Sequence, residues 1–498
     1  MITKLPEAAR FKRITSRGLR YSLSLALGGV TLLSSACLVG PKYQRPSAPV
    51  PAVYKELSPP DSAQANVWKQ AQPSDGAARG KWWEIYNDPN LNALEEQVSI
   101  SNQNILAAEA QFRAARDAVR IARSSLFPTV STAPSYTNSR SYASPQHNSY
   151  DWPVDISYQA DVWGSIRRTV RGSAESAQVT AAQLENVRLA LQAALAQDYF
   201  ELHGVDSEQE LLARTVKSYE EYLQLTKDRF ASGVASGADV AQAETQLKSA
   251  QVQLIDLGVA RTQLEHAIAI LVGKPPAEVT IPPAAIKTPP PSIPVGVPSD
   301  LLQRRPDIAA AERQMAVANE QIGISKAAFF PTVLLTASAG FESGSFTSWF
   351  AWPSRLWSVG PQVAETVFDA GRRRAQSDLA RAAFDAATAS YRQSVLTSFQ
   401  QVEDNLAALR VLANEARAED DAVRAAQQSL DVSTYQYKAG VASYLQVITV
   451  QAIALQNQVA AVNILTRRMV ASVLLIEALG GGWDASTLPT EQNLVHGR

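Results

Sequence analysis

The sequence of 498 residues contains one cysteine, four histidines and three methionines, and each scarcity excludes a kind of chemistry. The single cysteine, Cys37, can form no internal disulfide and has no second thiol with which to share a zinc or redox site. The histidines lie far apart, without the spacing of metal ligands. No nucleophile elbow, P-loop or dinucleotide fingerprint is present. The sequence therefore predicts a protein that is not an enzyme and holds no metal and no cofactor.

Long apolar runs and excess charge are scarce as well. Beyond residue 36, no run approaches the ~20 apolar residues of a membrane-spanning helix, which excludes pumps and channels built from helical spans. The chain has 46 basic and 47 acidic side chains, and residues 1–36 hold six of the basic ones and one of the acidic ones. The remainder therefore has a net charge of −6, and nothing indicates a nucleic-acid partner.

Residues 1–36 have the composition of a secretory signal peptide. Basic residues precede the apolar stretch 21–33, and three small residues follow it, as at a cleavage site. The sequence LSSAC, residues 33–37, resembles a bacterial lipobox, in which the cysteine is acylated and becomes the new N-terminus. Each acyl chain contributes ~0.8 kcal/mol per buried CH₂ to membrane binding. We expect a covalent lipid on Cys37 and, because Leu38 resembles an outer-membrane sorting residue, the outer membrane of a Gram-negative bacterium. The alternative is an ordinary signal peptide followed by an incidental cysteine.

The rest of the chain contains an internal repeat. The sequence NQNILAAEAQ (102–111) recurs as RPDIAAAERQ (305–314), LFPTV (126–130) as FFPTV (329–333), and RFASGVAS (229–236) as QYKAGVAS (436–443). A period near 200 residues indicates a duplicated domain. Nine prolines in 275–298 indicate a stiff linker. We predict the following division: an extended, lipid-anchored N-terminal segment 37–80, a first repeat 81–274, the linker 275–298, a second repeat 299–484 and a C-terminal tail 485–498.

Each repeat contains helices far longer than a globular core needs. A helical stretch ends at Phe-Pro (88–127 and 300–330), and a long proline-free helix follows later (165–232 and 371–439). After a Gly-Val-Ala-Ser break comes a shorter helix, 237–272 or 444–480. The long helices span ~100 Å at 1.5 Å per residue, and the two shorter ones of each repeat, laid end to end, match that length. Apolar residues recur three and four positions apart along the long helices, which is also typical of a rod-like coiled coil. A structural coiled-coil lipoprotein of the cell envelope is therefore the alternative.

Four strand-like segments lie between the helices, at 129–138, 152–162, 332–341 and 356–368. Each has about the ten residues with which a tilted β-strand crosses a bilayer. Aromatic residues gather at both ends, which predicts membrane-interface anchors; two hairpins capping a helical domain are the alternative. The predicted anchors are Trp152, Trp349, Trp352 and Trp357 near one rim and Trp163 near the other.

Four strands cannot close a barrel, and an open sheet edge is not tolerated in lipid. We therefore expect an oligomer. Three copies give twelve strands and a lumen, whereas two give eight strands with a filled interior. A general-diffusion porin is disfavoured, because porins build the barrel within one chain and lack such helices.

The sequence resembles the TolC-like outer-membrane efflux proteins, in particular their lipoprotein branch. The residues that carry the resemblance are CLVGPKYQRP (37–46), WWEIYNDPNL (82–91), LLQRRPDIAAAE (301–312), FFPTV (329–333) and VFDAGRRRA (367–375). The resemblance implies a mainly α fold with a transmembrane β-barrel: a homotrimer with a twelve-stranded barrel that continues into a twelve-helix periplasmic α-barrel. It implies the exit duct of a tripartite efflux pump, whose partners are a periplasmic adaptor and an inner-membrane transporter, expected to be RND-type. Type I export of polypeptides keeps the same fold and stays open.

The repeated Gly-Val-Ala-Ser breaks are predicted to be tight helix–turn–helix tips, in which glycine ends one helix and serine caps the next. Ser443 with Gln446 fits a capping box, and Ser236 with Asp239 a looser one. The resemblance places adaptor docking and a periplasmic gate at these tips, although Gln446 departs from the family's acidic ring. The predicted docking residues are Gly233, Val234, Ala235, Ser236, Gly440, Val441, Ala442 and Ser443, and the gate candidates are Arg229, Asp239, Tyr437, Lys438, Tyr444 and Gln446.

Arginines follow a strand at the start of each long helix: Arg167 and Arg168, and Arg372, Arg373 and Arg374. Cations at a helix N-terminus oppose the helix dipole at about 0.3–1 kcal/mol each. We expect the phosphates of outer-membrane lipid to offset this cost; a solvated charge run is the alternative. The strand interiors are small and polar, which indicates a water-filled conduit for small molecules, with cargo specificity in the transporter.

Overall fold

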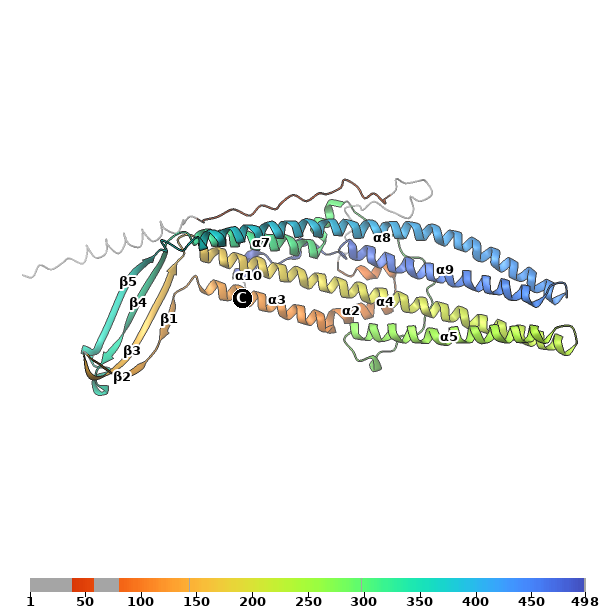
Figure 1. Cartoon of the computed structure of the whole chain (residues 1–498), viewed down its shortest axis with the longest axis horizontal. Coiled ribbons are helices and arrows are strands. Elements are labelled where there is room, and N and C mark those ends of the chain that lie inside the picture. Colours follow the sequence, from red (N-terminus) through yellow and green to blue (C-terminus); the bar gives the residue numbers. More distant parts are fainter. Residues whose placement is uncertain (1–37, 58–79, 143, 297, 497–498) are drawn as a thin grey trace, which may run out of the picture.

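The computed structural model describes residues 38–57, 80–142, 144–296 and 298–496. Figure 1 shows an elongated molecule with a sheet at one end and long helices side by side. At the far end, each of the two longest helices turns back into a shorter helix. Cys37 and the predicted signal peptide lie outside the described residues.

The helices form one layer of four columns. The helices α4 (Ser165–Ala231) and α8 (Arg372–Lys438) have 67 residues each and are two of these columns. The other two columns are shorter helices end to end: α3 (Gln103–Ser124), α2 (Pro89–Ser101) and α5 (Gly237–Leu271) in one, α7 (Pro306–Ala327) and α9 (Tyr444–Ala478) in the other. The α7/α9 column lies between α4 and α8, whereas the α3/α5 column is at the edge. The match in length that the sequence analysis predicts, two shorter helical stretches end to end against one long helix, is confirmed.

The sequence predicts one helical stretch in each of 88–127 and 300–330. In the structure each stretch is divided into two helices. Asn102 ends α2 with an extended backbone, and its side-chain oxygen caps α3. Arg305 separates α6 (Leu301–Arg304) from α7, because the residue before a proline is disfavoured in the helical region. The residue at each break binds the C-terminal end of the next helix in the same column. Asn102 Nδ2 donates to Leu271 O at the end of α5 (2.8 Å), and Arg305 donates to Ala478 O at the end of α9 (2.8 Å).

By composition alone, α9 is long and apolar enough to cross a membrane, with a mean hydropathy of 1.7 over its most apolar window. The expectation that no segment beyond residue 36 resembles a membrane helix is therefore wrong. Within the chain, α9 packs against α8 and α4 and buries Val447, Ile464 and Val473. This central position buries 39 % of the most apolar window of α9.

The sheet is antiparallel, in the order β1 (Thr129–Thr132), β3 (Ser144–Ala160), β4 (Thr332–Ser343), β5 (Arg355–Ala364). A further strand, β2 (Ser135–Ser141), also pairs with β3, so β1 and β2 act as one interrupted strand. The four predicted strands are present, but β3 begins eight residues earlier than 152 and β5 ends at 364. Within the described chain, β1/β2 and β5 are open edges.

Several segments cover one face of α4, here called the covered face. The N-terminal segment binds Arg168, the C-terminal tail binds Gln178, α2 binds Gln192, and the linker binds Asp206 and Ser207. The C-terminal tail contains α10 (Glu491–His496), whose Leu494 is buried against α3 and α4. The opposite face of α4, here called the bare face, carries Asp198, Glu201 and Glu208, as helical spacing requires.

Candidate functional site: a conduit from sheet to helical tips

The strand register divides the sheet into an apolar and a polar face. Trp152 pairs with Phe341, Val154 with Ala339, and Ile156 with Ala337. Because side chains alternate along a strand, these residues share one face. The same face carries Val130, Val333, Leu335, Trp357, Val359 and Val363. The other face carries Ser157, Gln159, Thr336, Ser338, Ser358 and Gln362. One face suits lipid and the other a water-filled bore.

The polar face is more acidic than the sequence analysis predicted. Asp151 lies directly opposite Glu342, and Asp155 follows on the same face of β3. Like charges opposite each other destabilise a sheet, so this pair requires water around it. The signal was present in the alternation of β3, where Asp151 and Asp155 stand four residues apart among polar residues.

Aromatic side chains form two bands at the ends of the sheet. At the outer end, Trp152 packs against Trp349 and Phe350, with ring centroids 6.4 and 5.4 Å away. Trp352 and Trp357, at the same end, are exposed. At the helical end, Trp163 stacks on Phe330 at 4.7 Å and donates to Pro331 O (2.8 Å). The predicted anchors therefore lie at the two ends of the strands.

The arginine cluster contradicts part of the lipid-phosphate expectation. Arg168 is 1 % exposed and donates to the Glu320 carboxylate (2.9 Å) and to Val39 O (2.7 Å). It is unavailable to lipid, because the N-terminal segment and α7 enclose it. Arg372 and Arg374, in contrast, are exposed at the start of α8.

The chain itself supplies anions for the helix starts. Asp161 accepts from the backbone N–H of Arg167 and from its guanidinium (3.0 and 2.9 Å). Asp369 likewise accepts from the backbone N–H and the guanidinium of Arg373. The hydrogen bond from the Arg373 guanidinium holds the pKa of Asp369 below its usual range. Two carboxylates thus offset the helix-dipole cost that the sequence analysis assigned to lipid. Neither carboxylate is predicted from the sequence, although both stand two or three residues before the glycine that starts a long helix.

The two tips have the predicted backbone. Gly233 and Gly440 have φ of 76° and 78°, the left-handed region that glycine tolerates best. The N–H groups of Val234 and Val441 each donate back to a carbonyl of the preceding helix (2.8 and 2.9 Å). Both valines are exposed at the end of the molecule. The turn geometry is confirmed.

The caps of the two tips differ. At the first tip, Ser236 and Asp239 form both bonds of a capping box. At the second tip, Ser443 makes no side-chain cap and Gln446 is exposed, so the capping box predicted there is wrong. A carboxylate accepts a backbone N–H through a charge-assisted bond, whereas a neutral amide gains less over water.

Aromatic and cationic side chains tie the tips together within one chain. The Arg229 guanidinium lies 4.7 Å from the Tyr437 ring centroid, and its Nη1 donates to Lys438 O (3.2 Å). The rings of Tyr437 and Tyr444 lie 5.4 Å apart, and burial raises the pKa of Tyr444 above its ordinary value. Of the gate candidates, Asp239 and Gln446 are not part of this tie.

A further contact between the long helices near the tips is not predicted from the sequence: Tyr222 Oη lies 2.9 Å from Thr434 Oγ1. Its only signal was tyrosine at helical spacing in α4. Among the described residues, no group of three or more His, Cys, Asp or Glu side chains is placed to hold a metal ion.

Comparison with known proteins identifies the fold. The family model described as "outer membrane efflux protein" matches residues 94–274 and 297–481. The chain belongs to the outer membrane efflux protein family. The toluene efflux pump outer membrane protein TtgC of Pseudomonas putida is 30 % identical, over 93 % of this chain and 96 % of that protein. The outer membrane protein OprJ of Pseudomonas aeruginosa is also 30 % identical, with the same two coverages.

Solved structures show the same architecture. The outer-membrane channel OprN superposes with a TM-score of 0.82 and 27 % identity, over 90 % of this chain and 100 % of that one. VceC of Vibrio cholerae gives a TM-score of 0.76 and 26 % identity, over 81 % and 99 %. The predicted mainly α, TolC-like fold is confirmed. The protein is an outer-membrane exit duct of a tripartite efflux pump, with a long periplasmic helical part.

Proposed function

We propose that the protein works as a lipid-anchored homotrimer that passively conducts small molecules, without enzymatic activity or a cofactor. The observation that carries the proposal is that a single chain leaves the edges of its sheet and of its helical layer unpaired. Its sheet has two open edges, β1/β2 and β5, and its helical layer has two, α3/α5 and α8. An open edge is not tolerated in lipid, so further copies must cover it.

The duplication supports the way in which copies would join. In the chain, Val179 and Ala182 of α4 form a buried cluster with Ala309 and Ala310 of α7. The repeat counterparts of these four residues are exposed at the two edges of the helical layer: Ala386 and Ala389 on α8, Leu106 and Ala107 on α3. Placing α8 of one copy against α3 of the next repeats the contact between the two repeats.

The strands follow the same rule. Ala160 of β3 pairs with Val333 of β4 across the two repeats. Their counterparts are Val367, after β5, and Val130 in β1, both exposed. Val367 of one copy would therefore lie beside Val130 of the next. Three copies give twelve strands and a bore that eight strands would not leave open.

The covered face of α4 would then lie outside, since three N-terminal segments, linkers and tails would otherwise fill the bore. The bare face, with Asp198 and Glu201, would line it. In this proposal residues 81–274 and 299–484 are the two repeats, joined by the linker 275–298. A polar bore of this kind suits passive flow, with cargo chosen by the transporter. TtgC is named for toluene and ArpC for antibiotics, which supports small-molecule cargo here.

The membrane end supports a lipid on Cys37. Its neighbour Leu38 packs against Gly164, at the junction of strand and helix, and Val39 N donates to Trp163 O (3.2 Å). An acyl chain on Cys37 would thus start at the inner edge of the membrane. Arg372 and Arg374 are exposed at the same level, beside the aromatic band at the helical end of the sheet, and would meet lipid phosphate there.

At the other end, exposed Val234 and Val441 offer a docking surface for the periplasmic adaptor of an RND-type transporter. The contact of Arg229 with Tyr437 and Lys438, next to Tyr444, would hold the gate closed. A bulky charge at Val234 or Val441 should abolish efflux while the trimer still assembles. Unchanged drug resistance would leave these tips as turns without a docking role.

The decisive test of the function is deletion of the gene and measurement of susceptibility to drugs, dyes and metal ions, with single-channel recording of the purified protein. We expect increased susceptibility and a low but measurable resting conductance, because the gate of the isolated protein is held closed. Loss of a secreted polypeptide with unchanged susceptibility would favour type I export, and absence of any conductance would favour a structural lipoprotein. Labelling with a clickable palmitate, lost in Cys37→Ser, tests the anchor.

A further inference from the structure

A cleft of about 740 Å³ opens between α4, α8 and α9, at the point where the linker leaves α4. Ser207, which accepts from Ile286 N (2.9 Å), belongs to both the linker contact and the cleft. Ala285 and Lys287 close the same end. The cleft therefore adjoins the covered face and lies outside the proposed bore. Its α4 wall, 207–222, is roughly 22 Å long by helical rise.

The lining is polar without being charged overall. Three amides, Gln427, Gln451 and Gln458, line it together with several hydroxyls. Hydroxyl groups come from Thr215, Ser218, Tyr222 and Thr434. The charged lining residues are two anions and two cations, of which Glu210 and Arg214 form a pair at 2.6 Å. Such a lining favours a neutral ligand with many hydrogen-bonding groups over an ion or an apolar drug.

One of these amides is buried and unsatisfied. Gln451 is 3 % exposed, and within the described part of the chain neither its Oε1 nor its Nε2 has a hydrogen-bond partner. A buried amide without partners costs stability that a ligand can recover. Both the donor and the acceptor of Gln451 are thus available to a ligand that enters the cleft and displaces the side chains that enclose them.

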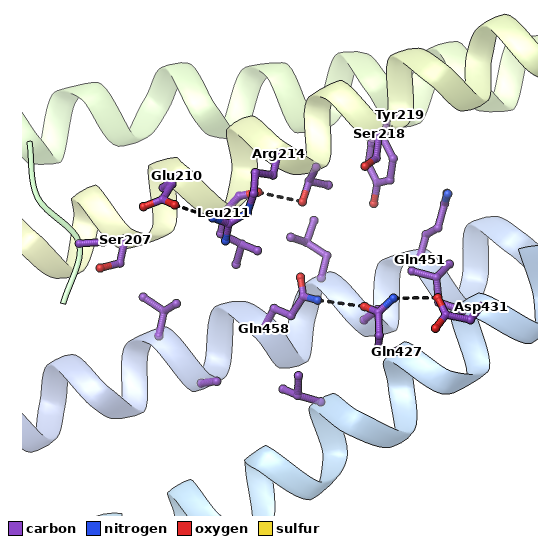
Figure 2. Close-up of a pocket in the computed structure, with 18 of the residues that line it drawn as sticks. Ser207, Glu210, Leu211, Arg214, Ser218, Tyr219, Gln427, Asp431, Gln451 and Gln458 are labelled. Carbon is purple, nitrogen blue, oxygen red and sulfur yellow. Dashed lines mark hydrogen bonds and ion pairs between the residues drawn. The ribbon is translucent and has the colours of Figure 1, made fainter. Parts of the chain in front are cut away.

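The neighbouring polar groups are already oriented. Gln458 Nε2 donates to Gln427 Oε1 (3.4 Å), and Gln427 Nε2 donates to Asp431 Oδ1 (3.0 Å). Figure 2 shows this chain of side chains leading to the end of the cleft where Gln451 and Asp431 lie. An amide and a carboxylate at one end provide a donor and acceptors close together.

We propose that this cleft binds a neutral saccharide chain in the periplasm, with adjacent hydroxyls on Gln451 and Asp431. Each hydroxyl donates and accepts at once, so two neighbouring hydroxyls match the Oε1 and Nε2 of one amide. The ring of Tyr222, which is half-buried and also lines the cleft, offers apolar surface to the C–H face of a sugar. The length of the cleft suits an oligosaccharide, and its open side lets a longer glycan continue.

The test uses the full-length protein in lauryldimethylamine oxide, because a glycoside detergent would itself compete for the cleft. Chitotetraose probes an acetamido glycan of the cell-wall type, and maltotetraose probes a plain glucan. We expect saturable binding of at least one of them by calorimetry, and the stronger of the two identifies the source. Gln451→Leu should weaken this binding about tenfold, the factor for a lost pair of hydrogen bonds.

Gln456→Leu is the matched control, since Gln456 lies on the same helix but is exposed in the cleft on the other side. It should leave binding unchanged. Gln451→Leu should keep or raise the melting temperature, because it removes an unpaired buried amide, and should leave conductance unchanged. Gln458→Leu provides a second variant if the first does not fold.

Three results would overturn the proposal: no saturable binding of either saccharide at millimolar concentration, equal binding by wild type and Gln451→Leu, or a structure with only water on Gln451. Gln451-dependent binding of a helical protein partner, without saccharide binding, would also overturn it. None of these outcomes bears on conduction, so the exit-duct function is tested separately.

Discussion

The helices α3 and α7 are counterparts of 22 residues each, yet they differ sharply in burial. Helix α7 packs between α4 and α8 and buries most of its residues, among them Ile308, Ala309 and Met315. Helix α3 packs mainly against α4, with α10 at one end, and leaves Leu106 and Ile121 exposed. Similar sequences therefore occupy an interior and an edge position. The difference indicates that α3 lacks the neighbour that α7 finds within the chain.

The largest effect is expected from a charge on the α3 edge. Leu106→Asp should abolish the trimer while the single chain still folds, because Leu106 is exposed in one chain but would face α8 of the next copy in the proposed trimer. Burying an unpaired charge at three interfaces is strongly unfavourable. Light scattering after size exclusion measures the trimer.

The matched variant is Ala309→Asp, at the counterpart position in α7. Ala309 is buried against α4 within one chain, so this variant should unfold the protomer itself. A trimeric Leu106→Asp protein would contradict the edge assignment, as would equal loss of helicity in both variants.

The next largest effect concerns an interaction that only one repeat has. Arg168, buried against Glu320, has the exposed Ala375 as its counterpart. Arg168→Ala would leave Glu320 as a buried charge without its partner, at a cost of about 3–5 kcal/mol in unfolding free energy. Urea denaturation followed by circular dichroism measures it. Ala375→Ser is the control and should change little; an Arg168→Ala protein as stable as the wild type would show that the N-terminal segment contributes nothing here.

The tips provide a smaller contrast. Asp239→Ala removes the capping box at the first tip, at about 1 kcal/mol of local stability, and should raise the resting conductance in planar bilayers. Gln446→Ala should have no such effect, because Ser443 has no side-chain cap to lose. Gln446→Asp should add the missing box and stabilise the second tip. Identical conductance in all three variants would separate the caps from gating.

The smallest effect is a pH dependence that differs between the two faces of α4. Burial, with Glu201 nearby, raises the pKa of Asp198 to about 6 on the bare face. Asp198 thus binds its proton more tightly in the folded state, and its unfavourable contribution appears as pH rises from about 4 through 6. Asp198→Asn should raise the melting temperature at pH 8 and leave it unchanged at pH 4.

Asp206, on the covered face, behaves oppositely. Burial raises its pKa, but hydrogen bonds from His203, Ala284 N and Arg261 prevail and lower it. Its contribution is present above the unfolded pKa and is lost as pH falls through the lowered value. Asp206→Asn should therefore destabilise the protein at pH 7 and less so at pH 3. The same pH response for both variants would contradict the distinction between the faces.

Periodicity and repetition predicted the large features, because they depend on local spacing. The 67-residue helices, the tips at Gly233 and Gly440 and the strand positions all follow from residues close in sequence. The partners of Arg168 could not be predicted in this way, because Val39 and Glu320 lie more than 120 residues away in the sequence. The failed cap at Ser443 shows that a motif matching in spacing can lack the charge that makes its bond favourable.

Disulfide cross-linking between the sheet edges tests the trimeric duct most directly. In a protein with Val130→Cys and Val367→Cys, oxidation in membranes should give a ladder of cross-linked dimers and trimers on denaturing gels. Each single variant should stay monomeric on the same gels. The pairing of Ala160 with Val333 inside the chain sets this expectation through the repeat. Absence of cross-links, or formation only within one chain, would contradict the closure of β5 on β1 of the next copy.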